Sequence, residues 1–243
     1  MKKILLLFFI LFFNVIYSYS LGQDTKGLTV SPEKDSVLAE ALKLRDLALE
    51  RLEQTVGSKV KVEFAENGTP TTLSGKFCER TYKHYTNFTL RFLQSFKDLF
   101  LLKDPESELT LEEFAMSKED DVHITFHQSY QGLPVYQTKL SVRFNREGCI
   151  TLIRGEWVPT PKIKIGQLRI TPKNALKILN KELKTAKSMD ETSFKLIIFP
   201  WEKETYLAWQ VNYHDQNSNP WACFIDAING GFLANLKMWV VLH

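Results

Sequence analysis

The 243-residue chain has few cysteines, little net charge and no apolar run of membrane-spanning length. Its three cysteines cannot all pair within one chain, which excludes a scaffold built mainly from disulfides. Lys and Arg total 31 and Asp and Glu total 28, and the net charge falls to +1 once Lys2 and Lys3 are set aside with the leader described below. A field this weak does not attract nucleic acid or an anionic membrane surface, so we expect no nucleic-acid partner.

The start of the chain has the three parts of a secretory signal peptide. Two lysines precede an apolar run over residues 4–16, and Ser18 and Ser20 then fall at the −3 and −1 positions of a cut before residue 21. The alternative is an uncut membrane anchor, but the apolar run is shorter than the roughly 20 residues that a membrane-spanning helix needs. We predict removal of residues 1–20, a secreted or periplasmic location, and no stable membrane anchor after cleavage.

With 44% apolar and 24% charged residues, the chain can form a real core. After a flexible lead-in over residues 21–35, the hydrophobic spacing predicts a first domain over residues 36–160. We expect its Phe-rich helix to pack an aromatic stripe on a three-stranded antiparallel meander, rather than to line a ligand cavity. The expected helices cover residues 36–56 and 85–99, and the expected strands cover residues 60–64, 71–77, 121–130, 139–144 and 149–157.

A second domain is expected over residues 161–243, because Pro159, Pro161 and Gly166 interrupt the preceding pattern. Thr171 followed by Pro172 is typical of a helix N-cap with proline at the first helical position. The fold class is therefore expected to be α+β, with two domains that each pack an antiparallel β-meander against one or two helices. In the second domain a helix is expected over residues 171–183, and strands over residues 193–199, 205–213, 221–226 and 232–240.

Motifs in both domains resemble a known family. In the first domain they are the strand and turn over 62–75 with Asn67-Gly68-Thr69-Pro70, the ending Leu99-Phe100-Leu101-Leu102, and the stretch from His123 through Gln128-Ser129-Tyr130-Gln131-Gly132-Leu133-Pro134-Val135 to Tyr136. These segments resemble the FTP propeptide domain of thermolysin-like and fungalysin metallopeptidases, in which Thr often stands where this chain has Asn67. The second domain resembles the PepSY domain that follows in those propeptides, through Ile170-Thr171, Tyr206–Val211, Phe224–Ala227 and Gly230-Gly231.

In that family a zinc peptidase domain follows, with a His-Glu-x-x-His motif whose histidines bind zinc and whose Glu is the general base. This sequence contains no His-Glu-x-x-His. The resemblance therefore implies a propeptide without its enzyme: no catalytic activity, no cofactor, and a thermolysin-like zinc metallopeptidase as partner, which the chain inhibits or helps to fold. The alternative is a secreted or surface interaction protein that uses the same modules for a ligand unrelated to proteases. A degenerate remnant without a present function is a third possibility.

The C-terminal tail is the candidate contact with this partner. The resemblance implies that the second domain packs on the catalytic domain and that the tail approaches the active-site cleft. An apolar, β-prone end is suited to adding a strand along a substrate groove, and a terminal imidazole could reach the partner's zinc; the ordinary alternative is the last strand of the meander. The candidate partner-binding residues are Met238, Trp239, Val240, Val241, Leu242 and His243.

Other chemistry has weaker support. His123 and His127 are four residues apart, but on a strand this spacing covers about 13 Å, which is too far for one metal ion. The carboxylate clusters at 112–113 and 119–121 are typical of solvated loops beside a strand, although paired carboxylates across a cleft can hydrolyse glycosides. At the end of its expected strand, Asp226 is interpreted as bonding to the turn backbone. We therefore expect no catalytic or metal-binding residues.

Cys78, Cys149 and Cys223 all lie in or beside expected strands. In an oxidising compartment two of them could form a disulfide, which would leave the third buried or available to a partner. The sequence does not choose between the three pairs.

Overall fold

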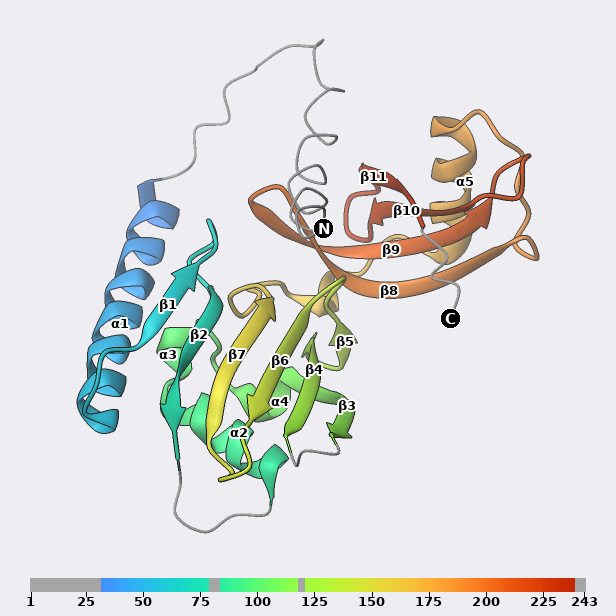
Figure 1. The fold of residues 1–243 in the computed structure, drawn as a ribbon. Coiled ribbons are helices and arrows are strands. Elements are labelled where there is room, and N and C mark those ends of the chain that lie inside the picture. Colours follow the sequence, from blue (N-terminus) through green and yellow to red (C-terminus); the bar gives the residue numbers. More distant parts are fainter. Residues whose placement is uncertain (1–31, 79–83, 118–120, 239–243) are drawn as a thin grey trace, which may run out of the picture. The chain divides into compact units, whose positions relative to one another are not determined.

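The computed structural model describes residues 32–78, 84–117 and 121–238 (Figure 1). The predicted signal peptide, residues 21–31 of the predicted lead-in, and the tail beyond Met238 lie outside these ranges. The chain divides into two compact units, Met1–Leu38 and Ala39–His243. Only the beginning of the first helix is described in the first unit, and both sheets belong to the second.

The first sheet has seven strands, in the order β1-β2-β7-β6-β4-β3 with β5 paired to β4. All of its pairs are antiparallel. The hairpin expected over residues 60–77 joins the expected meander through pairing of β2 with β7, so the two form one sheet. The strands are β1 (Lys61–Phe64), β2 (Pro70–Phe77), β3 (Leu109–Met116), β4 (Val122–Tyr130), β5 (Leu133–Pro134), β6 (Lys139–Phe144) and β7 (Ile150–Glu156).

Strand β3 corrects the sequence-based prediction. Glu112 and Glu113 lie within this strand and not in a loop, and the short helix α4 (Pro105–Glu108) precedes it. A bulge between Leu111 and Glu113 inserts one extra residue against β4. The bulge interrupts the alternation of apolar and polar residues, and the alternation is the signal on which strand prediction depends.

Three helices pack against the first sheet and contribute side chains to the same hydrophobic core. They are α1 (Pro32–Val56), α2 (Tyr85–Ser95) and α3 (Lys97–Phe100). α1 begins four residues before the predicted start and stops before Gly57, whose φ of 70° is a left-handed conformation that glycine adopts readily. The helix predicted over 85–99 breaks at Ser95, where α2 ends and α3 follows.

The aromatic stripe of α2 is a core face, as predicted. The Phe92 ring centroid lies 5.1 Å from that of Phe77 on β2 and 5.2 Å from that of Phe96. The ring centroids of Phe88 and of Phe144 on β6 lie 5.9 Å apart. These contacts place the helix on the sheet face formed by the buried side chains of β4, β6 and β7.

The second sheet has four strands in the order β11-β10-β9-β8, covered on one face by α5 (Pro172–Glu182). The Thr171 hydroxyl accepts a hydrogen bond from the Asn174 N–H at 3.2 Å, which confirms the predicted N-cap. The strands are β8 (Thr192–Trp201), β9 (Glu204–His214), β10 (Pro220–Asp226) and β11 (Phe232–Lys237). Two antiparallel sheets packed with helices confirm the expected α+β class. Among the described residues, no helix combines the length and apolar character that a membrane-spanning helix needs.

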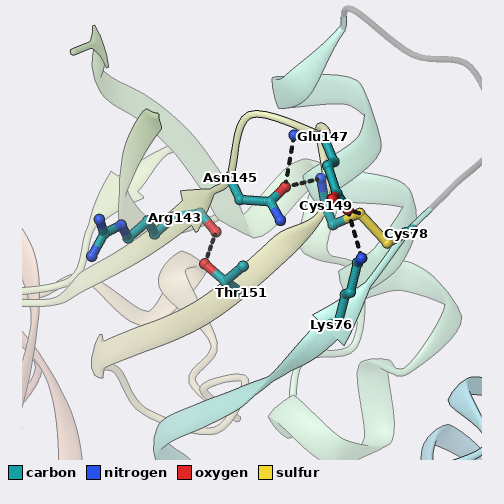
Figure 2. The surroundings of a disulfide bond; sticks show 7 residues. All are labelled: Lys76, Cys78, Arg143, Asn145, Glu147, Cys149 and Thr151. Atoms are coloured by element: carbon teal, nitrogen blue, oxygen red, sulfur yellow. Dashed lines mark hydrogen bonds and ion pairs between the residues drawn. A yellow bond between two sulfur atoms is a disulfide. The ribbon is translucent and has the colours of Figure 1, made fainter. Parts of the chain in front are cut away.

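A disulfide joins Cys78 and Cys149, at the end of β2 and just before β7 (Figure 2). The side chain of Asn145 shapes the turn before Cys149, because its Oδ1 accepts from the N–H groups of Glu147 at 3.1 Å and Cys149 at 3.0 Å. Cys223 stays a buried free thiol on β10, and burial raises its pKa to about 12. The tertiary structure thus chooses the pair that the sequence left open.

Candidate functional site

The family-like motifs converge on one segment, which we call the connector: residues 157–164, between β7 and the short 3₁₀ helix η2 (Ile165–Gln167). Side chains from three distant segments, the β1–β2 turn, α4 and β4, hydrogen-bond to the connector. We call this set the clamp; it consists of Asn67, Thr69, Glu108, Gln128 and Tyr130. The connector includes the predicted domain boundary between residues 160 and 161, which itself stays a prediction.

Gln128 forms a two-point contact with the connector. Its Nε2 donates to the Val158 carbonyl at 2.8 Å, and its Oε1 accepts from the Val158 N–H at 3.1 Å. A single side-chain amide thus pairs with the backbone of Val158 as a neighbouring strand would. Gln128 is almost fully buried, so these bonds satisfy polar groups that water does not reach.

The turn between β1 and β2 holds the start of the connector. Asn67 donates from Nδ2 to the Trp157 carbonyl at 3.0 Å, and its Oδ1 accepts from the Thr69 N–H at 3.0 Å and the Thr69 hydroxyl at 2.7 Å. The Trp157 indole donates in turn to the carbonyl of Phe100 at 2.9 Å. The turn motif and the Leu-Phe-x-Leu ending therefore meet at Trp157.

Glu108 is a buried carboxylate, 4% exposed, that closes the clamp. It accepts from the N–H groups of Lys103 at 3.0 Å and Asp104 at 2.9 Å, and from the Thr160 hydroxyl at 2.8 Å. The Thr160 N–H donates to the carbonyl of Leu101 at 3.0 Å. Three donors offset the cost of burying this carboxylate, which a single donor would not.

The end of the same motif contacts the second sheet. Val135 forms a parallel bridge with Ile198 of β8, and the Tyr136 N–H donates to the Ile198 carbonyl at 2.8 Å. The Tyr136 ring lies edge-on to Phe224 at 4.7 Å and to Phe199 at 5.5 Å, and those two rings stack at 4.0 Å. Burial raises the pKa of the Tyr136 phenol. The motif from Gln128 to Tyr136 therefore binds the connector at one end and the second sheet at the other.

The residues singled out from the sequence are not brought together. On β4, His123 is exposed and His127 is half-buried. The two histidines point to the same face of the strand, with Thr125 between them on that face. Asp226 accepts at Oδ1 from the N–H groups of Ile228 at 2.7 Å and Asn229 at 3.1 Å, which confirms its predicted role in the turn. Within residues 32–78, 84–117 and 121–238, no three His, Cys, Asp or Glu side chains form a group that could hold a metal ion.

Of the predicted partner-binding tail, the structure describes only the first residue. The Met238 N–H donates to the Pro220 carbonyl at 2.9 Å, just beyond the end of β11. The predicted strand over 232–240 ends at Lys237. Trp239, Val240, Val241, Leu242 and His243 lie outside the described residues, so their role stays a prediction.

The clamp was not predicted, although the sequence holds one signal for it. Ile124, Phe126 and Gln128 alternate along β4 and are all buried, so they share the core face of the strand. A glutamine on a core face requires partners for both its amide groups. This requirement predicts a specific polar contact, but only the tertiary structure shows that the partner is the backbone of Val158.

Replacing Gln128 with leucine is expected to lower the free energy of unfolding by about 1–3 kcal/mol, because the N–H and C=O of the half-buried Val158 lose their partner. Urea unfolding followed by circular dichroism measures the loss, and amide hydrogen exchange at Val158 should accelerate. Leucine at the exposed Gln167 is the control, with an expected change below about 0.5 kcal/mol. Unchanged exchange at Val158 in the Gln128 variant would show that the contact does not hold the connector.

The fold and the clamp together describe an α+β protein with two antiparallel sheets, in which polar side chains hold the connector between the sheets. No protein-family model matches the chain. Over 194 residues the chain is 25% identical to bacillolysin from Brevibacillus brevis, an alignment that covers 74% of this chain and 37% of bacillolysin. The aligned residues lie on both sides of the connector, because neither side alone makes up that share of the chain.

A solved structure shows a weaker likeness. The YpmB protein from Bacillus subtilis is 16% identical, and the match covers 54% of this chain and 88% of YpmB with a TM-score of 0.23. A likeness at this level carries no argument about function.

Proposed function

We propose that the protein is a propeptide-like module that binds a thermolysin-like zinc metallopeptidase, as an inhibitor or as a folding assistant. The match to bacillolysin is the observation that supports this most directly. It covers 74% of this chain but only 37% of bacillolysin, and this chain contains no His-Glu-x-x-His. What the two proteins share therefore lies outside that zinc-binding motif, as it would for the part of a precursor that accompanies a catalytic domain.

The clamp supports a binding role for physical reasons. A module that must match the surface of a folded enzyme binds more tightly when its parts are already fixed, because less conformational entropy is lost on association. Gln128 and Asn67 fix the connector, and Tyr136 contacts the second sheet. The motif residues thus contribute to preorganisation and do not themselves have to touch the partner.

The proposed contact with the partner is the C-terminal tail. Met238 follows β11, a strand at the edge of its sheet. A segment that continues from an edge strand can pair with another extended backbone without disturbing the sheet that it leaves. The residues proposed to enter the substrate groove are Met238, Trp239, Val240, Val241, Leu242 and His243.

Titration of the chain lacking residues 1–20 into the isolated catalytic domain of bacillolysin tests this proposal. Peptide hydrolysis should fall as the chain is added, or the yield of active enzyme should rise when the denatured domain is refolded with it. Deletion of Val240–His243 should weaken either effect, and a variant with Gly-Ser-Gly-Ser in their place controls for chain length. An intact effect in both variants rules out the tail. The absence of inhibition and of refolding assistance, together with recovery of partners other than zinc peptidases from the exporting cell, would refute the proposed function.

A further inference from the structure

Strand β3 forms an edge of the first sheet and carries exposed apolar side chains. It is the last strand in the order β1-β2-β7-β6-β4-β3, so within the described part of the chain it pairs on one side only. Leu111 is 46% exposed, Phe114 is 48% exposed and Met116 is 56% exposed. An edge that combines an unpaired backbone with apolar side chains is a template for another extended strand.

These three side chains extend the core face of the sheet beyond its helical cover. The register places Leu111 opposite Phe126, Phe114 opposite Ile124 and Met116 opposite Val122, and the three partners on β4 are fully buried. Directly opposed residues of antiparallel strands point to the same face. The Phe114 ring lies beside that of Tyr85, the first residue of α2, with 6.2 Å between the two centroids. The apolar face of β4 therefore continues onto β3, where its side chains are exposed.

The usual protection of an edge is missing on this strand. Edge strands commonly carry lysine or proline, which discourage pairing with another chain. The other three edges have one or both: β1 has Lys61, β8 has Lys195 and Pro200, and β11 has Lys237. β3, with the sequence LTLEEFAM, has neither.

The charge on the strand indicates the partner's chemistry. Glu112 and Glu113 are exposed, and β3 contains no cationic residue. Nearby, Asp121 is paired with Arg143 at 2.6 Å, so that cation is already neutralised. Two carboxylates on an unpaired edge favour a neighbouring strand that carries basic residues, because opposite charges across a strand pair stabilise it.

We propose that β3 is a strand-addition site for an extended segment of a partner protein in which apolar residues alternate with lysine or arginine. Backbone hydrogen bonds to the free edge supply affinity, and contacts with Leu111, Phe114 and Met116 and with the two glutamates supply specificity. This site does not depend on the proposed docking to a peptidase, since it uses the first sheet and not the C-terminal tail.

Binding of a nine-residue peptide of alternating lysine and valine tests the site, with fluorescence anisotropy of the labelled peptide as the readout. Met116→Lys introduces the missing protection and should weaken binding at least roughly tenfold. The matched control is Phe232→Lys on the edge strand β11, which is 36% exposed at that residue and should bind as the unchanged chain does. Slower amide exchange over residues 109–116 in the presence of the peptide would locate the contact.

Three outcomes would overturn the proposal. A peptide with glutamate in place of lysine should bind much more weakly, and equal binding would show that charge does not select the segment. A lysine-valine peptide that is N-methylated at the residues whose N–H groups would face β3 should not bind, since it cannot complete the backbone ladder. Binding of this peptide as tightly as the unmethylated one would rule out strand addition. Self-association of the chain that Met116→Lys abolishes, without binding of any peptide, would identify a second copy of this chain as the occupant.

Discussion

Replacing Cys78 and Cys149 together with serine is expected to lower the free energy of unfolding by about 4 kcal/mol. The two cysteines are 71 residues apart in the sequence, and the bond between them closes a loop that contains α2, β3, β4 and β6. Without it the unfolded chain gains the freedom of that loop, while the native pairing of β2 with β7 stays available. An effect of this size is a large part of the stability of an ordinary domain.

Urea unfolding with and without a reductant measures the contribution of the disulfide. Reduction should bring the unchanged chain down to the midpoint of the double variant and should not affect the variant itself. Cys223→Ala is the control, because that thiol is free and its replacement leaves the effect of the reductant intact. A midpoint that does not respond to the reductant in the unchanged chain would contradict the prediction.

Replacing Trp157 with alanine is expected to cost about 3–5 kcal/mol. The indole is buried in the first core, and its centroid lies 6.1 Å from the centroid of the Phe100 ring. Its Nε1 donates a hydrogen bond to the Phe100 carbonyl at 2.9 Å. Alanine leaves a cavity the size of the ring and an unpaired carbonyl. It also loosens the point at which Asn67 holds the connector.

Trp157→Phe separates the two contributions. Phenylalanine fills most of the cavity but cannot donate a hydrogen bond, so the expected loss is about 1 kcal/mol. Equilibrium unfolding gives both values, and amide exchange over residues 157–164 should accelerate more in the alanine variant. Equal losses in the two variants would show that the hydrogen bond, and not the packing of the ring, is the main contribution.

Much of the secondary structure could be predicted from local patterns. The strand expected over residues 139–144 has the same bounds in the structure, and the N-cap at Thr171 is confirmed. Both depend on side chains close together in the sequence, where the alternation of a strand or the chemistry of a cap is fully visible. Strand β3 could not be predicted in this way, because its bulge interrupts the alternation of apolar and polar residues.

The clamp could be predicted only in part. The motif from Gln128 to Tyr136 resembles the family in sequence, but its sequence does not indicate that it bridges the connector and the second sheet. Gln128 and Val158 are 30 residues apart, and Asn67 and Trp157 are 90 apart. Contacts over such distances depend on which strands become neighbours, and local periodicity carries no information about that choice.

By itself the sequence determined the α+β class, the faces of most strands and helices, the export signal as an expectation, and the lack of a His-Glu-x-x-His motif. Only the tertiary structure decided that Cys78 pairs with Cys149, that β3 forms an unprotected edge, and that the motif residues hold the connector. The physical reason is the range of the interactions. Capping and amphipathic periodicity act within a few residues, whereas disulfides, sheet edges and buried polar contacts exist only after distant segments have been brought together.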